Sequence, residues 1–88
     1  MSTAIMQAMA CGKPVVASDV PGINNMIQHN TTGILVPPKD PVALADALTR
    51  LINNPAMADQ LANNAFNFAV ANYSNKKMLD NYKAIFFN

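Results

Sequence analysis

The chain has 88 residues, of which 51% are hydrophobic and 12% are charged, with six Lys or Arg against five Asp and no Glu. The hydrophobic content excludes an intrinsically disordered chain, and the nearly balanced charge excludes a basic surface for nucleic acid or an anionic membrane. No apolar run approaches the ~20 residues of a membrane span, the start lacks the regions of a secretory signal, and the single cysteine cannot form an internal disulfide. We therefore expect one small cytoplasmic domain of marginal stability, which could associate with a membrane only through parts absent from this chain.

The first predicted elements are a short helix and a buried strand. Residues 4–10 are mostly good helix formers, and Gly12 supplies the left-handed residue at which such a helix can end. Pro14 then blocks continuation of the helix. Residues 15–17 form a continuous apolar run, which is typical of a strand that helices cover on both faces of a parallel sheet. Residues 19–22 end this strand in a turn.

A second strand is predicted at residues 34–36, where apolar, largely β-branched side chains precede a pair of prolines. Residues 23–27 can make about one helical turn between the strands, which favours a parallel pair. In open α/β sheets, ligands bind at the carboxyl ends of the strands. We therefore expect a candidate site in two parts, the loop at residues 19–23 and the start of the first helix at residues 2–7.

Two longer helices are predicted in the second half of the chain. Asp40 is a good helix cap and a proline follows it, which marks the start of a helix that runs to about Asn53. The same pattern recurs at Asn54 and Pro55, and this next helix should end near Asn72. The apolar residues at helical spacing in the first of these helices are Leu44, Leu48, Leu51 and Ile52. The buried face of the second is predicted to hold Met57, Leu61, Ala65 and Phe68.

Two stretches carry a family resemblance, QAMACGKPVVASDVPG and, after it, TTGILVPPKDPVALADAL. Together they resemble the carboxyl-terminal segment of retaining glycosyltransferases of the GT-B fold, of the glycosyl transferases group 1 or family 4 type. The resemblance covers nearly the whole chain, and it is specific because several separate blocks recur in the right order at the right spacings. It departs from the usual pattern at Gln7, where a second glutamate is usual, and at Pro21 and Asn25, where Gly and Glu are common. The first acidic position of that pattern would fall before Met1.

The resemblance implies a fold, a domain and a reaction. The fold is α/β, a partial Rossmann-like fragment with a short parallel sheet flanked by helices, in which residues 1–88 form the carboxyl-terminal part of a nucleotide-sugar-binding domain. Residues 74–88 would be a helix that crosses back to an amino-terminal acceptor domain absent from this chain. Ser74 can cap this helix, whose apolar stripe holds Met78, Leu79, Tyr82, Ile85 and Phe86.

The implied parent reaction is retaining transfer of a sugar from a nucleoside-diphosphate sugar to an acceptor hydroxyl. The 88-residue chain alone is expected to be inactive, because the acceptor domain and the first acidic position are missing. The alternative is a non-catalytic remnant that binds nucleotide weakly or docks to a protein partner, and Gln7 supports it. The nucleotide sugar is a substrate, so no metal or other cofactor is implied.

The resemblance also implies donor-binding residues. Gln7 falls at the ribose of the donor, where its amide carbonyl can accept a hydrogen bond, and the alternative is an exposed polar residue near a helix start. Ser2, Thr3 and Ala4 offer a hydroxyl and free N–H groups for a diphosphate, and the alternative is ordinary N-capping. Gly22 can let the backbone approach the donor, or it can serve only as a turn glycine. No residue is assigned a catalytic role.

The remaining candidate residues receive structural interpretations. Cys11 is expected to be a small apolar residue in the core, and His29 lies in a polar loop without a second metal ligand nearby. Asp19 alone among the aspartates is placed at the end of a strand, and no pair of carboxylates for acid–base hydrolysis is evident. The cationic side chains that would assist departure of a diphosphate are predicted to lie outside this chain.

Overall fold

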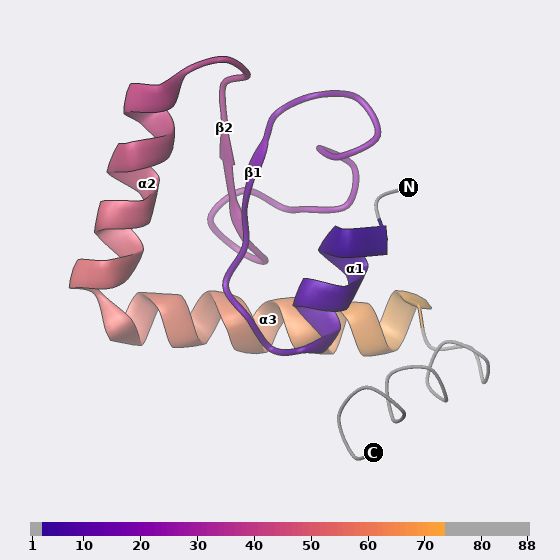
Figure 1. The fold of residues 1–88 in the computed structure, drawn as a ribbon. Helices are drawn as coiled ribbons and strands as arrows, with labels where there is room; N and C mark the ends of the chain where they lie inside the picture. Colours follow the sequence, from indigo (N-terminus) through magenta and orange to yellow (C-terminus); the bar gives the residue numbers. More distant parts are fainter. Residues whose placement is uncertain (1–2, 74–88) are drawn as a thin grey trace.

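The computed structural model describes residues 3–73, whose arrangement is shown in Figure 1. Within these residues the elements are, in order, α1 (Thr3–Ala10), β1 (Val16–Ser18), β2 (Ile34–Val36), α2 (Pro41–Asn53) and α3 (Pro55–Tyr73). The strands form a parallel sheet, so the predicted α/β class with a short parallel sheet and flanking helices is confirmed. The predicted helix at residues 74–88 lies outside the described residues.

The first helix ends where Gly12 reverses the backbone. Gly12 has a φ of +68°, its N–H donates to the Met9 carbonyl at 3.0 Å, and the Lys13 N–H donates to the Ala8 carbonyl at 3.1 Å. These two bonds satisfy carbonyls of the last turn that have no partner within the helix. The predicted glycine stop is therefore confirmed.

The two strands pair over their whole length. The Val15 carbonyl accepts from the Ile34 N–H at 2.9 Å, and the Asp19 N–H donates to the Val36 carbonyl at 2.8 Å. β1 therefore lies one residue later than the predicted range 15–17. The register sets Val16, Ala17 and Ser18 opposite Ile34, Leu35 and Val36.

The segment between the strands returns the chain to the amino end of the sheet. Its turns begin earlier than the predicted residues 23–27, because the Val20 carbonyl already accepts from the N–H groups of Ile23 and Asn24. Gly33 closes the segment, where a Cβ would lie 2.9 Å from the Val15 carbonyl oxygen and 3.0 Å from the Ile27 side chain. Only glycine allows this close approach of the two strands.

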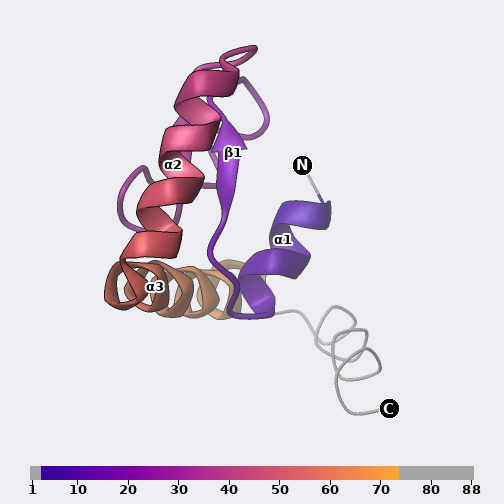
Figure 2. The ribbon, with the colours of Figure 1, turned by 60° about the vertical axis from the view of Figure 1, so that its left-hand side comes forward.

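The helices enclose the sheet from different sides (Figures 1 and 2). α2 packs on the face that carries Ile34 and Val36, and α1 packs with the segment between the strands on the other side. α3 runs crosswise to α2 at the level of the amino ends of the strands and contributes to both groups of buried residues. The first group consists of Met9, Val15, Met26, Ile27, Ala65 and Ala69. The second consists of Ile34, Val36, Ala47 and Leu61.

The longer helices follow the sequence prediction in their bounds but not in every buried position. On α3, Leu61 and Ala65 are buried as predicted, and Met57 and Phe68 are half-buried. On α2, the sheet is contacted by small residues, of which Ala47 is buried and Ala43 is half-buried. The leucine and isoleucine stripe of α2 is only partly covered, since Leu51 is half-buried whereas Leu44, Leu48 and Ile52 are 41%, 45% and 76% exposed.

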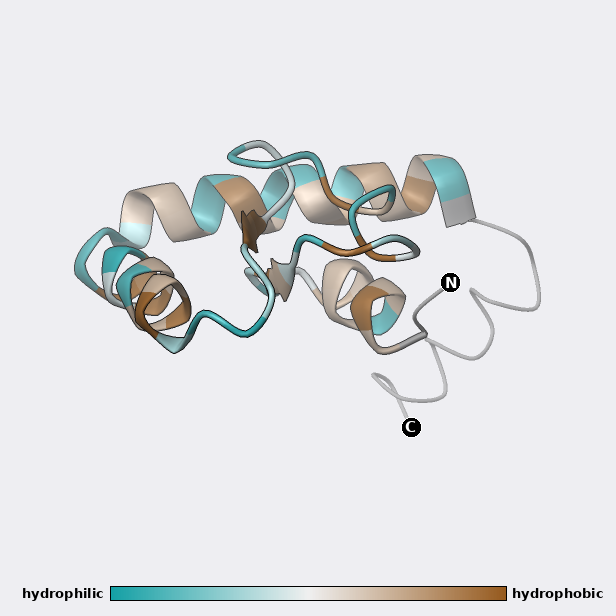
Figure 3. Cartoon of the chain, turned by 90° about the horizontal axis from the view of Figure 1, so that it is seen from above, coloured by the Kyte–Doolittle hydropathy of each residue, from teal (hydrophilic) through white to brown (hydrophobic). Residues whose placement is uncertain are grey.

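Seen from above, the hydrophobic residues of β2 lie at the centre of the molecule and the surrounding loops are largely hydrophilic (Figure 3). In the part of the chain from residue 3 to residue 73, no helix combines the length and the apolar character needed to cross a membrane.

Candidate functional site

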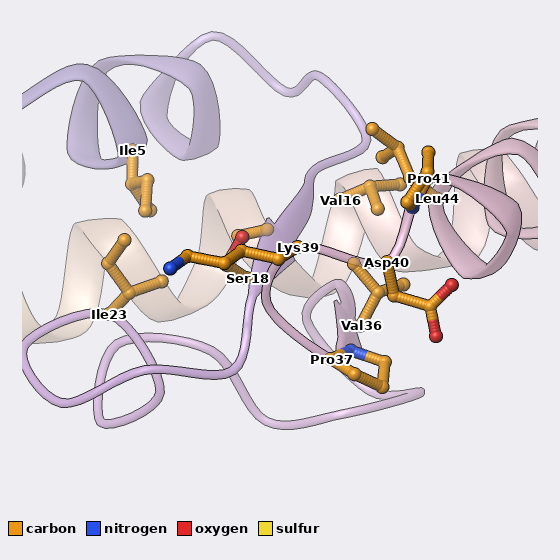
Figure 4. Close-up of a pocket in the computed structure, with 11 residues that line it drawn as sticks. Ile5, Val16, Ser18, Ile23, Val36, Pro37, Lys39, Asp40, Pro41 and Leu44 are labelled. Atoms are coloured by element: carbon orange, nitrogen blue, oxygen red, sulfur yellow. The ribbon is translucent and has the colours of Figure 1, made fainter.

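A pocket of about 620 Å³ lies along β1 (Figure 4). All residues of β1 line it, together with Ile5 of α1 and Leu44 of α2. Successive side chains of a strand point to opposite faces of the sheet, so a pocket touched by the whole strand runs along its edge. The other residues that line the pocket are Ile23, Val36, Pro37, Lys39, Asp40 and Pro41.

The backbone of β1 contributes polar groups to this pocket. The Val15 carbonyl and the Asp19 N–H bond to β2. Because alternate residues of a parallel strand direct their main-chain groups to opposite edges, the N–H and carbonyl of Val16 are directed toward the open edge. The Ser18 carbonyl on the same edge accepts from the Val20 N–H at 3.0 Å. The pocket therefore has mostly apolar walls, with a few hydrogen-bonding groups along one strand.

The pocket extends to the carboxyl end of the sheet, where a ligand was predicted to bind. The loop after β1, the loop after β2 and the first turn of α2 lie at this end, whereas the first turn of α1 lies nearer to the level of the amino end of β1 (Figure 1). Asp40 caps the amino end of α2: its Oδ1 accepts a hydrogen bond from the Ala43 N–H at 2.9 Å, and a proline follows at the first helical position. The predicted cap is therefore confirmed, and its carboxylate is engaged with the helix.

Lys39 is a cation on the wall of this pocket. Its side chain extends past Ser18 toward Ile23 and Ile5, whereas the Asp40 carboxylate points the other way (Figure 4). Lys39 has a φ of +57°, in the left-handed region, and within residues 3–73 no carboxylate forms an ion pair with it. Its position between a strand and a helix cap is the sequence signal that could have identified it, because such loops lie at the carboxyl edge of a parallel sheet.

The predicted donor-binding residues are not all on the pocket wall. On α1, Ile5 lines the pocket, and Gln7 lies about 200° further round the helix, so it faces outward and is exposed. Ala4, three residues before Gln7, is exposed on the same side. Thr3 is the first residue of α1, and Ser2 lies outside the described residues.

Gly22 lies in the exposed loop after β1, next to the pocket residue Ile23. It has a φ of +89°, and a Cβ there would meet no atom within 4 Å. Glycine is therefore favoured at this position by the backbone conformation and not by crowding from the described residues. The predicted turn at Gly22 is therefore confirmed, and its close approach to a donor remains a prediction.

Comparison with known proteins identifies the family. Residues 1–68 match the family described as Glycosyl transferases group 1. The chain belongs to this family. The group 1 chain is 41% identical over 70 residues to the alpha-D-kanosaminyltransferase of Streptomyces kanamyceticus, a match that covers 80% of this chain and 18% of that protein. It is 34% identical over 86 residues to an uncharacterized glycosyltransferase of Methanocaldococcus jannaschii, covering 98% and 22%.

Solved structures of GT-B glycosyltransferases share the fold of this group 1 chain. Sucrose-phosphate synthase from Thermosynechococcus elongatus aligns with a TM-score of 0.82 at 36% identity, over 98% of this chain and 23% of that one. The Anabaena protein HepE, in complex with UDP-glucose, aligns with a TM-score of 0.84 at 26% identity, over 97% of this chain and 23% of that one. The chain thus spans about a fifth to a quarter of the length of the proteins that it matches.

Other candidate residues of the group 1 chain have structural roles. The Nδ1 atom of His29 accepts from the Leu35 N–H at 3.0 Å, which satisfies a donor on the outer edge of β2. Asp19 is exposed, and its Oδ1 accepts from the Asn24 amide at 3.1 Å, which holds the turn after β1. Cys11 is half-buried rather than fully buried. Among residues 3–73, no three His, Cys, Asp or Glu side chains gather closely enough to hold a metal ion.

Proposed function

We propose that this chain is the donor-binding segment of a glycosyltransferase that moves a sugar from a nucleoside-diphosphate sugar to an acceptor hydroxyl with retention of configuration. The observation that carries the proposal is a pocket at the carboxyl edge of the sheet, in a fold that aligns over 97% of its length with a protein solved in complex with UDP-glucose. Membership of the group 1 family supports sugar transfer as the reaction.

In the proposed complex, the first turn of α1 faces the diphosphate. The N–H groups at the start of a helix have no partner within the helix and carry partial positive charge, so Thr3 and Ala4 would stabilise the departing diphosphate, with the Ser2 hydroxyl beside them. The Gln7 carbonyl would accept a hydrogen bond from a ribose hydroxyl on the outer side of α1. Gly22 would let the backbone of the loop after β1 approach the donor.

Residues 1–88 would then form the carboxyl-terminal part of the donor domain, in a cytoplasmic protein whose acceptor domain lies outside this chain. The proposal includes residues 74–88 as the helix that returns to that domain. The sequence match over residues 1–68 supports the first part of this arrangement. On this proposal the 88-residue chain alone binds donor nucleotide weakly and transfers no sugar.

Isothermal titration of the chain with UDP, GDP and ADP tests donor binding, and transfer from the matching nucleotide sugars tests activity. We expect one nucleotide to bind in the high micromolar to millimolar range, with no turnover above a heat-treated control. Turnover by the isolated chain would overturn the fragment part of the proposal. Binding of none of the nucleotides would overturn the donor-binding part.

A second candidate function is docking of a protein segment along β1. The open main-chain groups of Val16 and the apolar side chains of Ile5 and Leu44 on either side favour addition of a parallel strand. A two-stranded sheet also gains stability from a third strand. Docking would occupy the strand edge around Val16 and leave the carboxyl end of the pocket, around Ser18, to a ligand. Chemical cross-linking in which the chain captures an extended apolar peptide, with loss of capture in Val16→Pro, would support this candidate.

A further inference from the structure

We propose that Lys39 is an anion-binding residue of this site and that its ammonium group contacts the diphosphate of the nucleotide donor. This inference rests on the proposed function for the identity of the ligand. The anion site itself rests on the position, charge and backbone of Lys39.

The charge of Lys39 is uncompensated in the pocket. Among the described residues that line the pocket, Lys39 is the one cation and Asp40 the one anion, and the Asp40 carboxylate accepts a hydrogen bond from the Ala43 N–H at the start of α2. The two side chains point in opposite directions (Figure 4). An anion in the pocket would therefore meet an ammonium group that no described carboxylate neutralises.

The walls around Lys39 strengthen such a contact. Its side chain extends past the end of β1 toward Ile23 and Ile5, which are apolar and half-buried. Lys39 itself is exposed, so water screens its charge in part, and these apolar side chains displace water from only one side of an anion bound there. Ser18 adds a hydroxyl beside the lysine side chain.

The backbone of Lys39 is unfavourable for a lysine. Residues with a side chain rarely adopt a φ of +57°, and glycine or asparagine would occupy this turn more easily. The turn is constrained on both sides, by Pro38 before it and by Asp40 and Pro41 after it. Unfavourable backbone conformations are concentrated at functional sites, and here the conformation directs the side chain over the carboxyl end of β1.

The location also suits a diphosphate. Ile5 places the first turn of α1 on the opposite wall of the pocket from Lys39, and that turn is where the proposed function puts the diphosphate. The ammonium group and the helix start would then approach the same anion from two sides. A nucleoside diphosphate and inorganic pyrophosphate share this chemistry, so the experiment must separate them.

The experiment titrates the full 88-residue chain by calorimetry with UDP, inorganic pyrophosphate and uridine. We expect Lys39→Gln to weaken the binding of UDP and of pyrophosphate by about tenfold, because a charged donor makes a stronger hydrogen bond than a neutral one. The binding of uridine should not change. Lys39→Arg should retain affinity within about threefold. The matched control is Lys13→Gln, which makes the same change of charge at the amino end of β1, and it should change each affinity by less than about twofold.

A fourth variant separates binding from stability. Lys39→Gly removes the cation and relieves the left-handed backbone, so it should lose UDP affinity as Lys39→Gln does while unfolding at a higher urea concentration than the parent. A merely structural lysine would not give these opposite changes. UDP binding that is equal in Lys39→Gln, Lys13→Gln and the parent would overturn the inference and leave the proposed function standing. Pyrophosphate binding that depends on Lys39, without any binding of UDP, would support the anion site and contradict the proposed donor.

Discussion

The cap of α2 offers a direct test of the geometry around the pocket. Asp40→Ala removes the Oδ1 atom that accepts from the Ala43 N–H at 2.9 Å, and Asp40 is half-buried, so water replaces this bond only in part. Loss of such a cap typically costs about 1 kcal/mol, within a range of about 0.5–2 kcal/mol. Partial burial places the expected loss in the upper half of this range, at about 1–1.5 kcal/mol. Asp40→Asn and Asp40→Ser keep a side-chain oxygen and should cost about 0.5 kcal/mol or less.

Urea unfolding followed by circular dichroism measures these differences as shifts of the midpoint at constant slope. The matched control is Asp46→Ala, on the exposed side of the same helix, which should be neutral or slightly stabilising because alanine is the better helix former. Equal losses in Asp40→Ala and Asp40→Asn, or a loss in Asp46→Ala as large as that in Asp40→Ala, would refute the assignment of Asp40 as the cap.

The other predictions concern the strand contact, the outer edge of the sheet and the donor ribose. Gly33→Ala should lower the free energy of unfolding in urea by about 1–3 kcal/mol, because its Cβ would lie 2.9 Å from the Val15 carbonyl oxygen. A loss below about 0.5 kcal/mol would contradict this contact. His29→Ala should cost about 0.5–1 kcal/mol by leaving the Leu35 N–H to water, and faster amide exchange at Leu35 would confirm the cause, whereas unchanged exchange would count against it. Gln7→Glu should tighten nucleotide binding about threefold to tenfold in calorimetry, because a charged acceptor makes the stronger hydrogen bond. An equal change in the control Gln60→Glu would show that net charge alone is responsible.

The local signals of the sequence predicted most of the fold. Gly12, Asp40 and the prolines that follow the caps act through short-range geometry, so the helix bounds could be predicted without knowledge of the packing. The pairing of the strands followed from their apolar runs and from the connection between them. Placement of β1 differed by one residue because Val15 is buried and hydrogen-bonded just outside the strand.

Three features depend on tertiary packing and could not be predicted from the sequence. The spacing of Leu44 and Leu48 predicts a helix, but it does not say which side meets the sheet, and α2 turns its small residues inward instead. The position of Lys39 depends on a left-handed backbone that no residue type in that turn requires, so its direction could not be read from the sequence. His29 bonds to an N–H six residues away, a contact that depends on the path of the intervening turn.

The central claim is that a nucleotide donor binds at the carboxyl ends of the two strands. Amide NMR of the isotope-labelled chain during titration with UDP tests it most directly. We predict that the largest shifts fall on Ser18 and Lys39 in the pocket, on Gly22 in the loop after β1, and on Ala4 and Gln7 on the outer side of α1. The amide signals of α3, which runs at the level of the amino ends of the strands (Figure 1), should not shift. Shifts that concentrate on α3, or shifts spread evenly over the chain, would contradict the claim.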